Sequence, residues 1–166
     1  YLPMTTILLT SRGLTPKQTA SRFADLRQHL GLRTCGLVYN ATGNPNSKYV
    51  ALAKKQLESA GLQVTMLDAR IMDDQKYDVM YIAGGNTFTL LSDINNGVGA
   101  DAFKQVVLAS QLIIAVSAGV VLLTPTMRIV SEIQPDQNEE KLTDYTALSI
   151  LDYEILPHYS ERLKDE

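Results

Sequence analysis

Apolar and polar positions along this chain follow two alternating patterns. Compact apolar runs predict buried strands, and most segments between them repeat apolar residues at helical spacing. The predicted strands are residues 6–9, 34–39, 64–67, 79–82 and 112–116. The predicted helices are residues 16–30, 50–60, 88–94 and 102–109. This alternation predicts an α/β fold with a doubly wound, mostly parallel sheet flanked by helices.

Two turns in this pattern directly follow a predicted strand and lead into a helix. The first is Ala83-Gly84-Gly85-Asn86-Thr87, and the second is Ser117-Ala118-Gly119. Right-handed crossovers bring the carboxyl ends of parallel strands to one edge of a sheet, where open α/β folds bind ligands. We therefore expect both turns at one binding edge.

Ser117 ends an apolar run and is followed by small residues. This pattern is typical of a nucleophile elbow, in which a tight strand-to-helix turn exposes a serine and the helix backbone passes close by. The match to G-x-S-x-G is incomplete because Ala115 replaces the first glycine. We interpret Ser117 as a candidate nucleophile.

A serine hydroxyl needs a base to accept its proton and a third group to orient that base. The chain has two histidines. His29 falls within the first predicted helix and is interpreted as a surface or structural residue. His158 follows an apolar run and Pro157, so we expect it at the end of a strand and interpret it as the candidate base.

The orienting acid is sought between the serine and the histidine, in the chain order of doubly wound hydrolases. Glu132 and Asp136 are the leading candidates. Glu132 follows the run 127–130, which we interpret as extended, so we expect it on or beside a strand. Asp136 is interpreted as a solvated loop residue, and Asp152 is a weaker alternative in the strand expected before His158.

Two backbone N–H groups are candidates for binding the oxyanion of an acyl-transfer reaction. Gly85 offers one, because a glycine pair lets the backbone approach a substrate, and Ala118 offers the other directly after the nucleophile. The glycine pair is also compatible with an ordinary tight turn. It has neither a G-x-G-x-x-G nor a G-K-[ST] signature, so the sequence does not favour nucleotide binding.

Composition narrows the possible partners. The 166 residues are 45% apolar and carry 15 basic and 18 acidic side chains without a dense basic run, so nucleic acid is not expected as a partner. No apolar run approaches the roughly 20 residues that span a bilayer, and no secretion signal is recognisable. We expect one cytoplasmic domain over residues 4–166, with residues 1–3 as a cloning remnant.

Metal and cysteine chemistry are not expected. Cys35 is the single cysteine and lies in an apolar run, so it is interpreted as a packing residue. With two histidines, a multi-histidine zinc site is improbable, although carboxylate ligands stay open. We expect no metal and no cofactor.

Four sequence blocks together resemble the aspartyl dipeptidase (peptidase E) family and its cyanophycinase relatives. They are Ala83-Gly84-Gly85-Asn86-Thr87-Phe88-Thr89-Leu90-Leu91, Val116-Ser117-Ala118-Gly119, Pro125-Thr126-Met127-Arg128 and Pro157-His158-Tyr159. The resemblance implies a serine hydrolase on a class I glutamine amidotransferase-like fold. The implied site residues are Ser117 as nucleophile, His158 as base, Glu132 as acid, and Gly85 and Ala118 as oxyanion donors. We also expect Gly84, Asn86 and Thr87 to bind the substrate.

Three features depart from this family. The dipeptidases carry aspartate where Glu132 stands, Ala115 replaces a glycine, and the chain stops soon after His158, where family members continue. Residues that recognise the acidic group of the substrate in the dipeptidases lie in that continuation and are not transferred.

The leading hypothesis is a serine peptidase that cleaves small peptides through a Ser-His-Glu triad and an acyl-enzyme. N-terminal aspartyl dipeptides are the substrates that the resemblance implies. The alternative is a noncatalytic or regulatory binding module on the same scaffold. A homodimer is also open, because proteins of this class often assemble in pairs.

Overall fold

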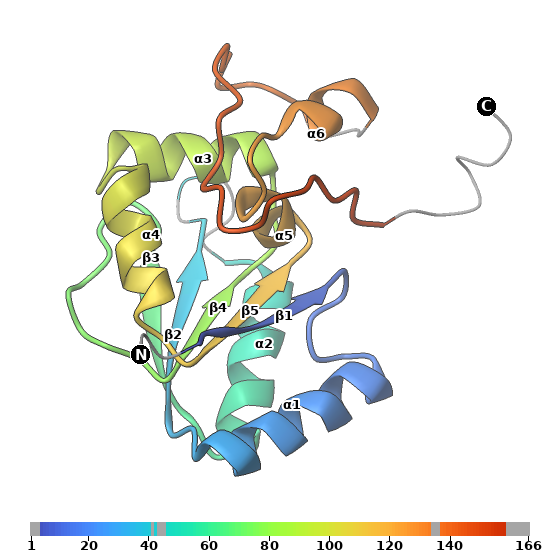
Figure 1. The fold of residues 1–166 in the computed structure, drawn as a ribbon, viewed down its shortest axis with the longest axis vertical. Helices are drawn as coiled ribbons and strands as arrows, with labels where there is room; N and C mark the ends of the chain where they lie inside the picture. The colour runs from blue at the N-terminus through green and yellow to red at the C-terminus, as the bar shows by residue number, and fades with distance from the viewer. Residues whose placement is uncertain (1–3, 41, 43–45, 134–136, 159–166) are drawn as a thin grey trace, which may run out of the picture.

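Five strands in the described part of the chain form one parallel sheet in the order β1-β5-β4-β2-β3 (Figure 1). The computed structural model describes residues 4–40, 42, 46–133 and 137–158, so residues 1–3 and Asp136 lie outside the described residues. The strands are β1 (Thr6–Thr10), β2 (Thr34–Tyr39), β3 (Gln63–Asp68), β4 (Val79–Ile82) and β5 (Leu112–Val116). All four strand pairings are parallel, and the doubly wound α/β sheet predicted from the sequence is confirmed.

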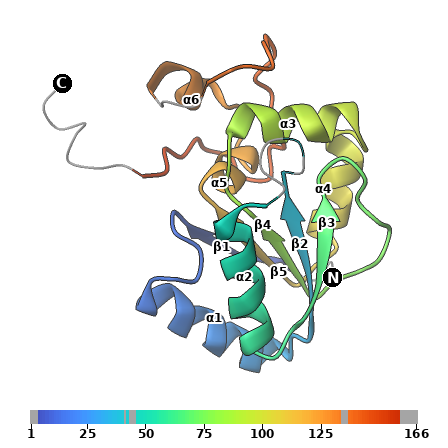
Figure 2. The ribbon, with the colours of Figure 1, turned by 180° about the vertical axis from the view of Figure 1, so that it is seen from behind.

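Helices cover both faces of the sheet (Figures 1 and 2). One face packs against α1 (Lys17–Leu30) and α2 (Lys48–Ser59), and the other against α3 (Thr87–Asn96), α4 (Ala100–Leu108) and α5 (Ala118–Leu122). Leu112 and Ile114 of β5 belong to the first core, whereas Ile113 and Ala115 belong to the second. Because both faces are buried, β5 has an unbroken apolar sequence.

Two segments expected to be extended are not strands. Residues 128–133 form the short helix α6 (Arg128–Ile133), because Met127 and Val130 are both buried and their three-residue spacing suits a helix that packs one side on the core. Residues 154–156 are irregular and Pro157 and His158 form a turn. Pro157 has no N–H to donate to a neighbouring strand.

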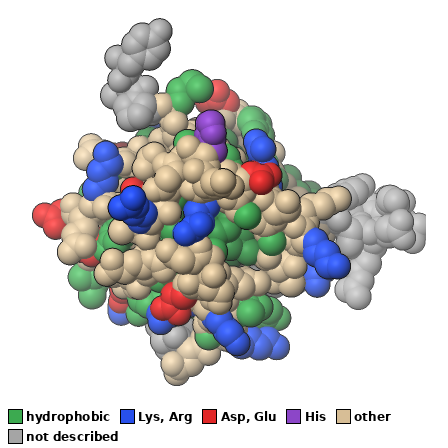
Figure 3. Space-filling model, turned by 90° about the horizontal axis from the view of Figure 1, so that it is seen from below, with side chains coloured by type: hydrophobic (Ala, Val, Ile, Leu, Met, Phe, Trp, Pro, Cys, Tyr) green, Lys and Arg blue, Asp and Glu red, His purple; other side chains and the backbone are tan. Residues whose placement is uncertain are grey.

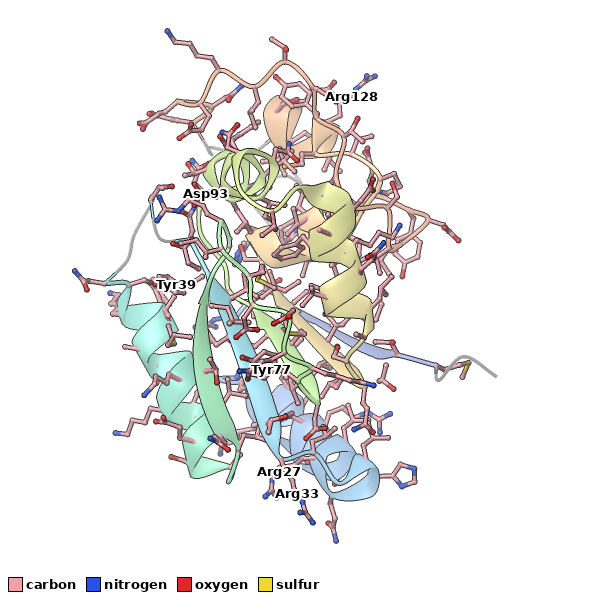
Figure 4. The ribbon with its side chains drawn as sticks, turned by 90° about the vertical axis from the view of Figure 1, so that its left-hand side faces the viewer. Arg27, Arg33, Tyr39, Tyr77, Asp93 and Arg128 are labelled. Atoms are coloured by element: carbon pink, nitrogen blue, oxygen red, sulfur yellow. The ribbon has the colours of Figure 1, made fainter. Side chains whose placement is uncertain are left out.

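The two ends of the sheet differ in the side chains that they carry. Arg27 and Arg33 lie at the amino edge, at the lower end of Figure 4, whereas Tyr39 and Asp93 lie toward the carboxyl edge. On the face seen in Figure 3, basic and acidic side chains are interspersed, so this face offers no continuous basic track. Among the helices of the described residues, none combines the length and the apolar content needed to cross a bilayer.

Asp78 links three strands at the amino edge of the sheet. Its carboxylate accepts hydrogen bonds from the backbone N–H of Arg33 (2.8 Å), which precedes β2, and of Thr34 (3.0 Å), which begins it. It also accepts a hydrogen bond from the side-chain amide of Gln111 (3.2 Å), which precedes β5. Burial alone would raise the pKa of Asp78, but these hydrogen bonds outweigh it and hold the pKa below its ordinary value of 3.8.

We expect Asp78→Asn to lower the free energy of unfolding at pH 7 by about 1 kcal/mol, since Asp78 is half-buried and its bonds are partly screened. The lowered pKa makes the carboxylate stabilising above its ordinary pKa, and this contribution is lost as pH falls through the folded-state pKa. Urea denaturation at pH 7 and near pH 2.5 measures both effects. Asp25→Asn, on the exposed side of α1, is the control. If Asp78→Asn lowers the free energy of unfolding equally at both pH values, the account is contradicted.

Candidate active site

Ser117 occupies the tight turn between β5 and α5. Its backbone angles are φ 51° and ψ −107°, a region that non-glycine residues rarely adopt. The N–H of Ser117 donates to the carbonyl oxygen of Thr10 in β1 (3.0 Å), and its own carbonyl accepts from Val120 (2.9 Å). The neighbouring strand and the first turn of the helix therefore hold this strained residue in place.

Small residues around Ser117 let three backbone segments approach closely. A Cβ added at Gly119 would lie 2.6 Å from the carbonyl oxygen of Ile82 at the end of β4. A Cβ added at Gly84 would lie 3.2 Å from the Cβ of Ser117 and 3.3 Å from the carbonyl oxygen of Val116. Glycine at these positions lets α5 and the β4–α3 turn lie against the elbow.

His158 meets Ser117 across a large separation in sequence. The Ser117 Oγ and His158 Nε2 atoms are 2.7 Å apart, a hydrogen-bond distance. The N–H of His158 also donates to the Oγ of Ser11, which directly follows β1, at 3.5 Å. The alcohol and the imidazole predicted as nucleophile and base thus lie in direct contact.

Glu132 is not brought to this pair. It is exposed on α6 and makes no hydrogen bond or ion pair with any residue that the structure describes. The alternative Asp152 lies in an exposed bend and also has no such contact with His158. Within residues 4–158, where described, no carboxylate forms an ion pair with the imidazole. The observed arrangement is a Ser-His pair.

The two expected oxyanion donors lie in the β4–α3 turn and at the start of α5. Gly85 is exposed with φ 154°, and a Cβ added there would meet nothing within 4 Å, so the space beside it is open to a ligand. Ala118 is the first residue of α5 and follows Ser117 directly. No described residue accepts a hydrogen bond from its N–H.

The expected substrate-binding residues have different surroundings. Gly84 and Asn86 line the cavity beside Ser117. The Asn86 side chain caps α3 by accepting from the N–H of Thr89 (3.1 Å), and it donates to the carbonyl oxygen of Gln137 (2.9 Å). Thr87 is buried and is not among the residues of the cavity wall.

A cavity of about 710 Å³ opens beside Ser117 and His158. Its walls come from the β1–α1 connection, the first turns of α2, the β4–α3 turn and the elbow. Arg12 is the only Lys, Arg, Asp or Glu side chain among the described residues that line it. The pattern along the chain gave no signal for Ser11 and Arg12 beyond their position directly after a strand.

A polar network supports the wall of this cavity near β2. The hydroxyl of Thr42 lies 2.7 Å from the buried carboxylate of Asp93 in α3 and 3.2 Å from the side-chain oxygen of Asn40. Asn40 lines the cavity, and Figure 4 places Asp93 at this end of the sheet. Sequence reasoning did not identify this network, because its members come from separate elements.

The surroundings of Cys35 disfavour thiol chemistry, and the described residues do not form a metal site. Burial raises the pKa of Cys35 on β2 to about 12, so its thiol stays protonated at neutral pH. The described residues contain no group of three or more His, Cys, Asp or Glu side chains that could hold a metal ion. The chemistry that this edge offers is the Ser117–His158 pair.

Two curated relatives from Listeria match the chain, and both are uncharacterized peptidases. The protein of Listeria innocua is 37% identical over 120 residues, which cover 68% of this chain and 57% of the relative. The protein of Listeria monocytogenes is 32% identical over 153 residues, covering 87% of this chain and 74% of the relative. The chain therefore spans little more than half the length of the first relative.

Solved structures share the fold. A Listeria monocytogenes protein provisionally named peptidase E superposes with a TM-score of 0.76 at 28% identity, over 94% of this chain and 80% of that one. A peptidase from an acI-B1 actinobacterium gives a TM-score of 0.68 at 14% identity, over 98% of this chain and 72% of that one. The sequence profile of peptidase family S51 matches residues 7–166. The chain therefore belongs to peptidase family S51.

Proposed function

We propose that this chain is a serine peptidase that cleaves small peptides through an acyl-enzyme. The observation that carries the proposal is the 2.7 Å contact between Ser117 Oγ and His158 Nε2 at a strained strand-to-helix turn. An aligned base is what converts a weakly nucleophilic hydroxyl into an attacking group. The names of the relatives agree with a peptidase.

The proposed reaction has two halves. His158 Nε2 takes the proton of Ser117 as Oγ attacks the carbonyl carbon, and the N–H groups of Gly85 and Ala118 donate to the developing oxyanion. His158 then gives the proton to the leaving amine as the C–N bond breaks. Water attacks the acyl-enzyme, His158 accepts its proton, and the proton returns to Ser117 Oγ as the acid leaves.

The substrate proposal is an N-terminal aspartyl dipeptide, which is the substrate that the resemblance to the aspartyl dipeptidase family implies. The test is a hydrolysis assay of the purified chain on Asp-Xaa, Asn-Xaa and Ala-Xaa dipeptides, with release of free amino acids as readout. A preference for Asp-Xaa supports this substrate class. Hydrolysis of all three at equal rates would contradict it.

Glu132 is proposed as the third member of the catalytic group, because the resemblance assigns the acid to this position. Its carboxylate has no partner among the described residues, and catalytic contacts often tighten only when substrate binds. We expect Glu132→Gln to lower kcat by about 100-fold or more, since an unoriented imidazole would lose its productive tautomer.

The matched control for this variant is Glu139→Gln, which removes an exposed carboxylate from the segment after α6. It should retain kcat within about twofold, as surface changes usually do. If both variants keep the wild-type kcat, Ser117 and His158 act without Glu132.

A further inference from the structure

We propose that Arg12 binds the free α-carboxylate of the residue that leaves when the peptide bond is cleaved. This inference rests on the proposed function, and it identifies a specificity-determining residue of the same site. It implies that the enzyme cleaves the last bond of short peptides that end in a free carboxylate.

Arg12 gives the described wall of the cavity a positive charge. The described wall of the cavity contains no carboxylate, and Arg12 is its one permanently charged side chain. The guanidinium makes no hydrogen bond or ion pair with any residue in the described ranges. An exposed, unengaged guanidinium beside a cavity can bind a carboxylate through two parallel hydrogen bonds.

Arg12 lies on one particular side of the nucleophile. In the sheet, β5 stands between β1 and β4 (Figure 1), so Ser117 has the β1–α1 connection on one side and the Gly84-Gly85 turn on the other. Thr10 pairs with Val116, and Ser11 accepts from the N–H of His158. Arg12 therefore lies on the side of Ser117 where the His158 backbone contacts the β1–α1 connection.

The two ends of the scissile bond face different groups of the site. The carbonyl oxygen points toward the N–H groups of Gly85 and Ala118, whereas the leaving nitrogen must lie near Nε2 of His158, which protonates it. The α-carboxylate of a single leaving residue lies only about one residue length, roughly 3.5 Å, beyond that nitrogen. A flexible arginine on the adjacent connection is suited to bind it.

The test compares Asp-Leu with Asp-Leu-amide, which lacks the terminal carboxylate. We expect wild-type kcat/KM to be about 10- to 100-fold higher for the free acid, the size of effect typical of a charge-assisted hydrogen-bonded pair. Arg12→Met, which keeps much of the side-chain length, should reduce this ratio to near 1. Arg12→Lys should retain part of it, because lysine keeps the charge without the planar fork.

Controls separate this inference from the proposed function. Arg22→Met removes an exposed charge on α1 and should keep the wild-type ratio. Fluorophosphonate labelling of the wild type tests the nucleophile independently of Arg12. If Ser117 is labelled but Arg12→Met leaves the acid-to-amide ratio unchanged, the role of Arg12 is wrong while the hydrolase stands.

The inference would also be overturned if Arg12 binds a different carboxylate of the substrate. If Arg12→Met removes discrimination between Asp-Leu and Asn-Leu but leaves the acid-to-amide ratio intact, Arg12 binds the acidic side chain on the acyl side. The two ratios are measured on the same preparations, so each outcome is decisive.

Discussion

Ser117→Ala is expected to lower kcat for peptide hydrolysis by about 10⁴-fold or more, because no acyl-enzyme can form without the hydroxyl. The size of the loss follows from the geometry. The hydroxyl lies 2.7 Å from the imidazole, and the strained backbone at φ 51° presents it beside the cavity. Residual hydrolysis would come from the oxyanion donors and substrate positioning alone.

The variant separates a lost nucleophile from a lost fold. Alanine keeps the Cβ of serine, so the hydrogen bond from the Ser117 N–H to Thr10 should persist. Thermal unfolding should therefore stay close to that of the wild type, while fluorophosphonate labelling disappears. Ser21→Ala on the exposed side of α1 is the matched control and should keep full activity. Full hydrolysis by Ser117→Ala would remove Ser117 from the mechanism.

His158→Gln is expected to lower kcat by about 10³- to 10⁵-fold. Glutamine can donate a hydrogen bond near Ser117 Oγ, but its side chain cannot accept and return a proton at neutral pH as imidazole does. His158 is exposed and its N–H contacts Ser11, so we expect only a small change in stability. The readouts are kcat and the rate of fluorophosphonate labelling, which should both fall.

The double variant gives a sharper test of the pair. Residues that act as one unit have non-additive effects, so Ser117→Ala with His158→Gln should be no slower than Ser117→Ala alone. His29→Gln, on the exposed side of α1, is the control and should leave kcat unchanged. Additive losses would mean that the two residues do not act together.

Part of the sheet could be predicted because its central strands β4 and β5 are apolar on both faces. Residues 112–116 and 79–82 have unbroken apolar sequences, buried except at the half-buried Val116, that match β5 and β4 at both ends. The turn at Ser117 was predictable for a related reason. An apolar strand that ends at a serine followed by alanine and glycine leaves few alternatives to a tight turn.

The helix that follows α5 could not be predicted in the same way. Met127 and Val130 are three residues apart, a spacing that suits a helix, but the short apolar run around them also resembles a strand. Tertiary packing against the core selects the helix α6. Glu132 therefore lies on an exposed helix rather than on or beside a strand.

Contacts between distant elements were also beyond the sequence. The strand order places β1 beside β5, so Ser11 and Arg12 lie next to the elbow although more than 100 residues separate them from Ser117. Local propensity contains no information about which strands are neighbours. The contact of Ser117 with His158 was predictable only as a requirement of the chemistry and of the family resemblance.

The central claim is that Ser117 becomes covalently acylated because His158 removes its proton. The most direct measurement is mass-spectrometric peptide mapping of the chain after treatment with a fluorophosphonate, performed on the wild type and on His158→Gln. We predict one phosphonyl adduct on the peptide that contains Ser117 in the wild type, and a much slower reaction in the variant. An unmodified Ser117 in a preparation that hydrolyses peptides, or an adduct at a different serine, would contradict the account.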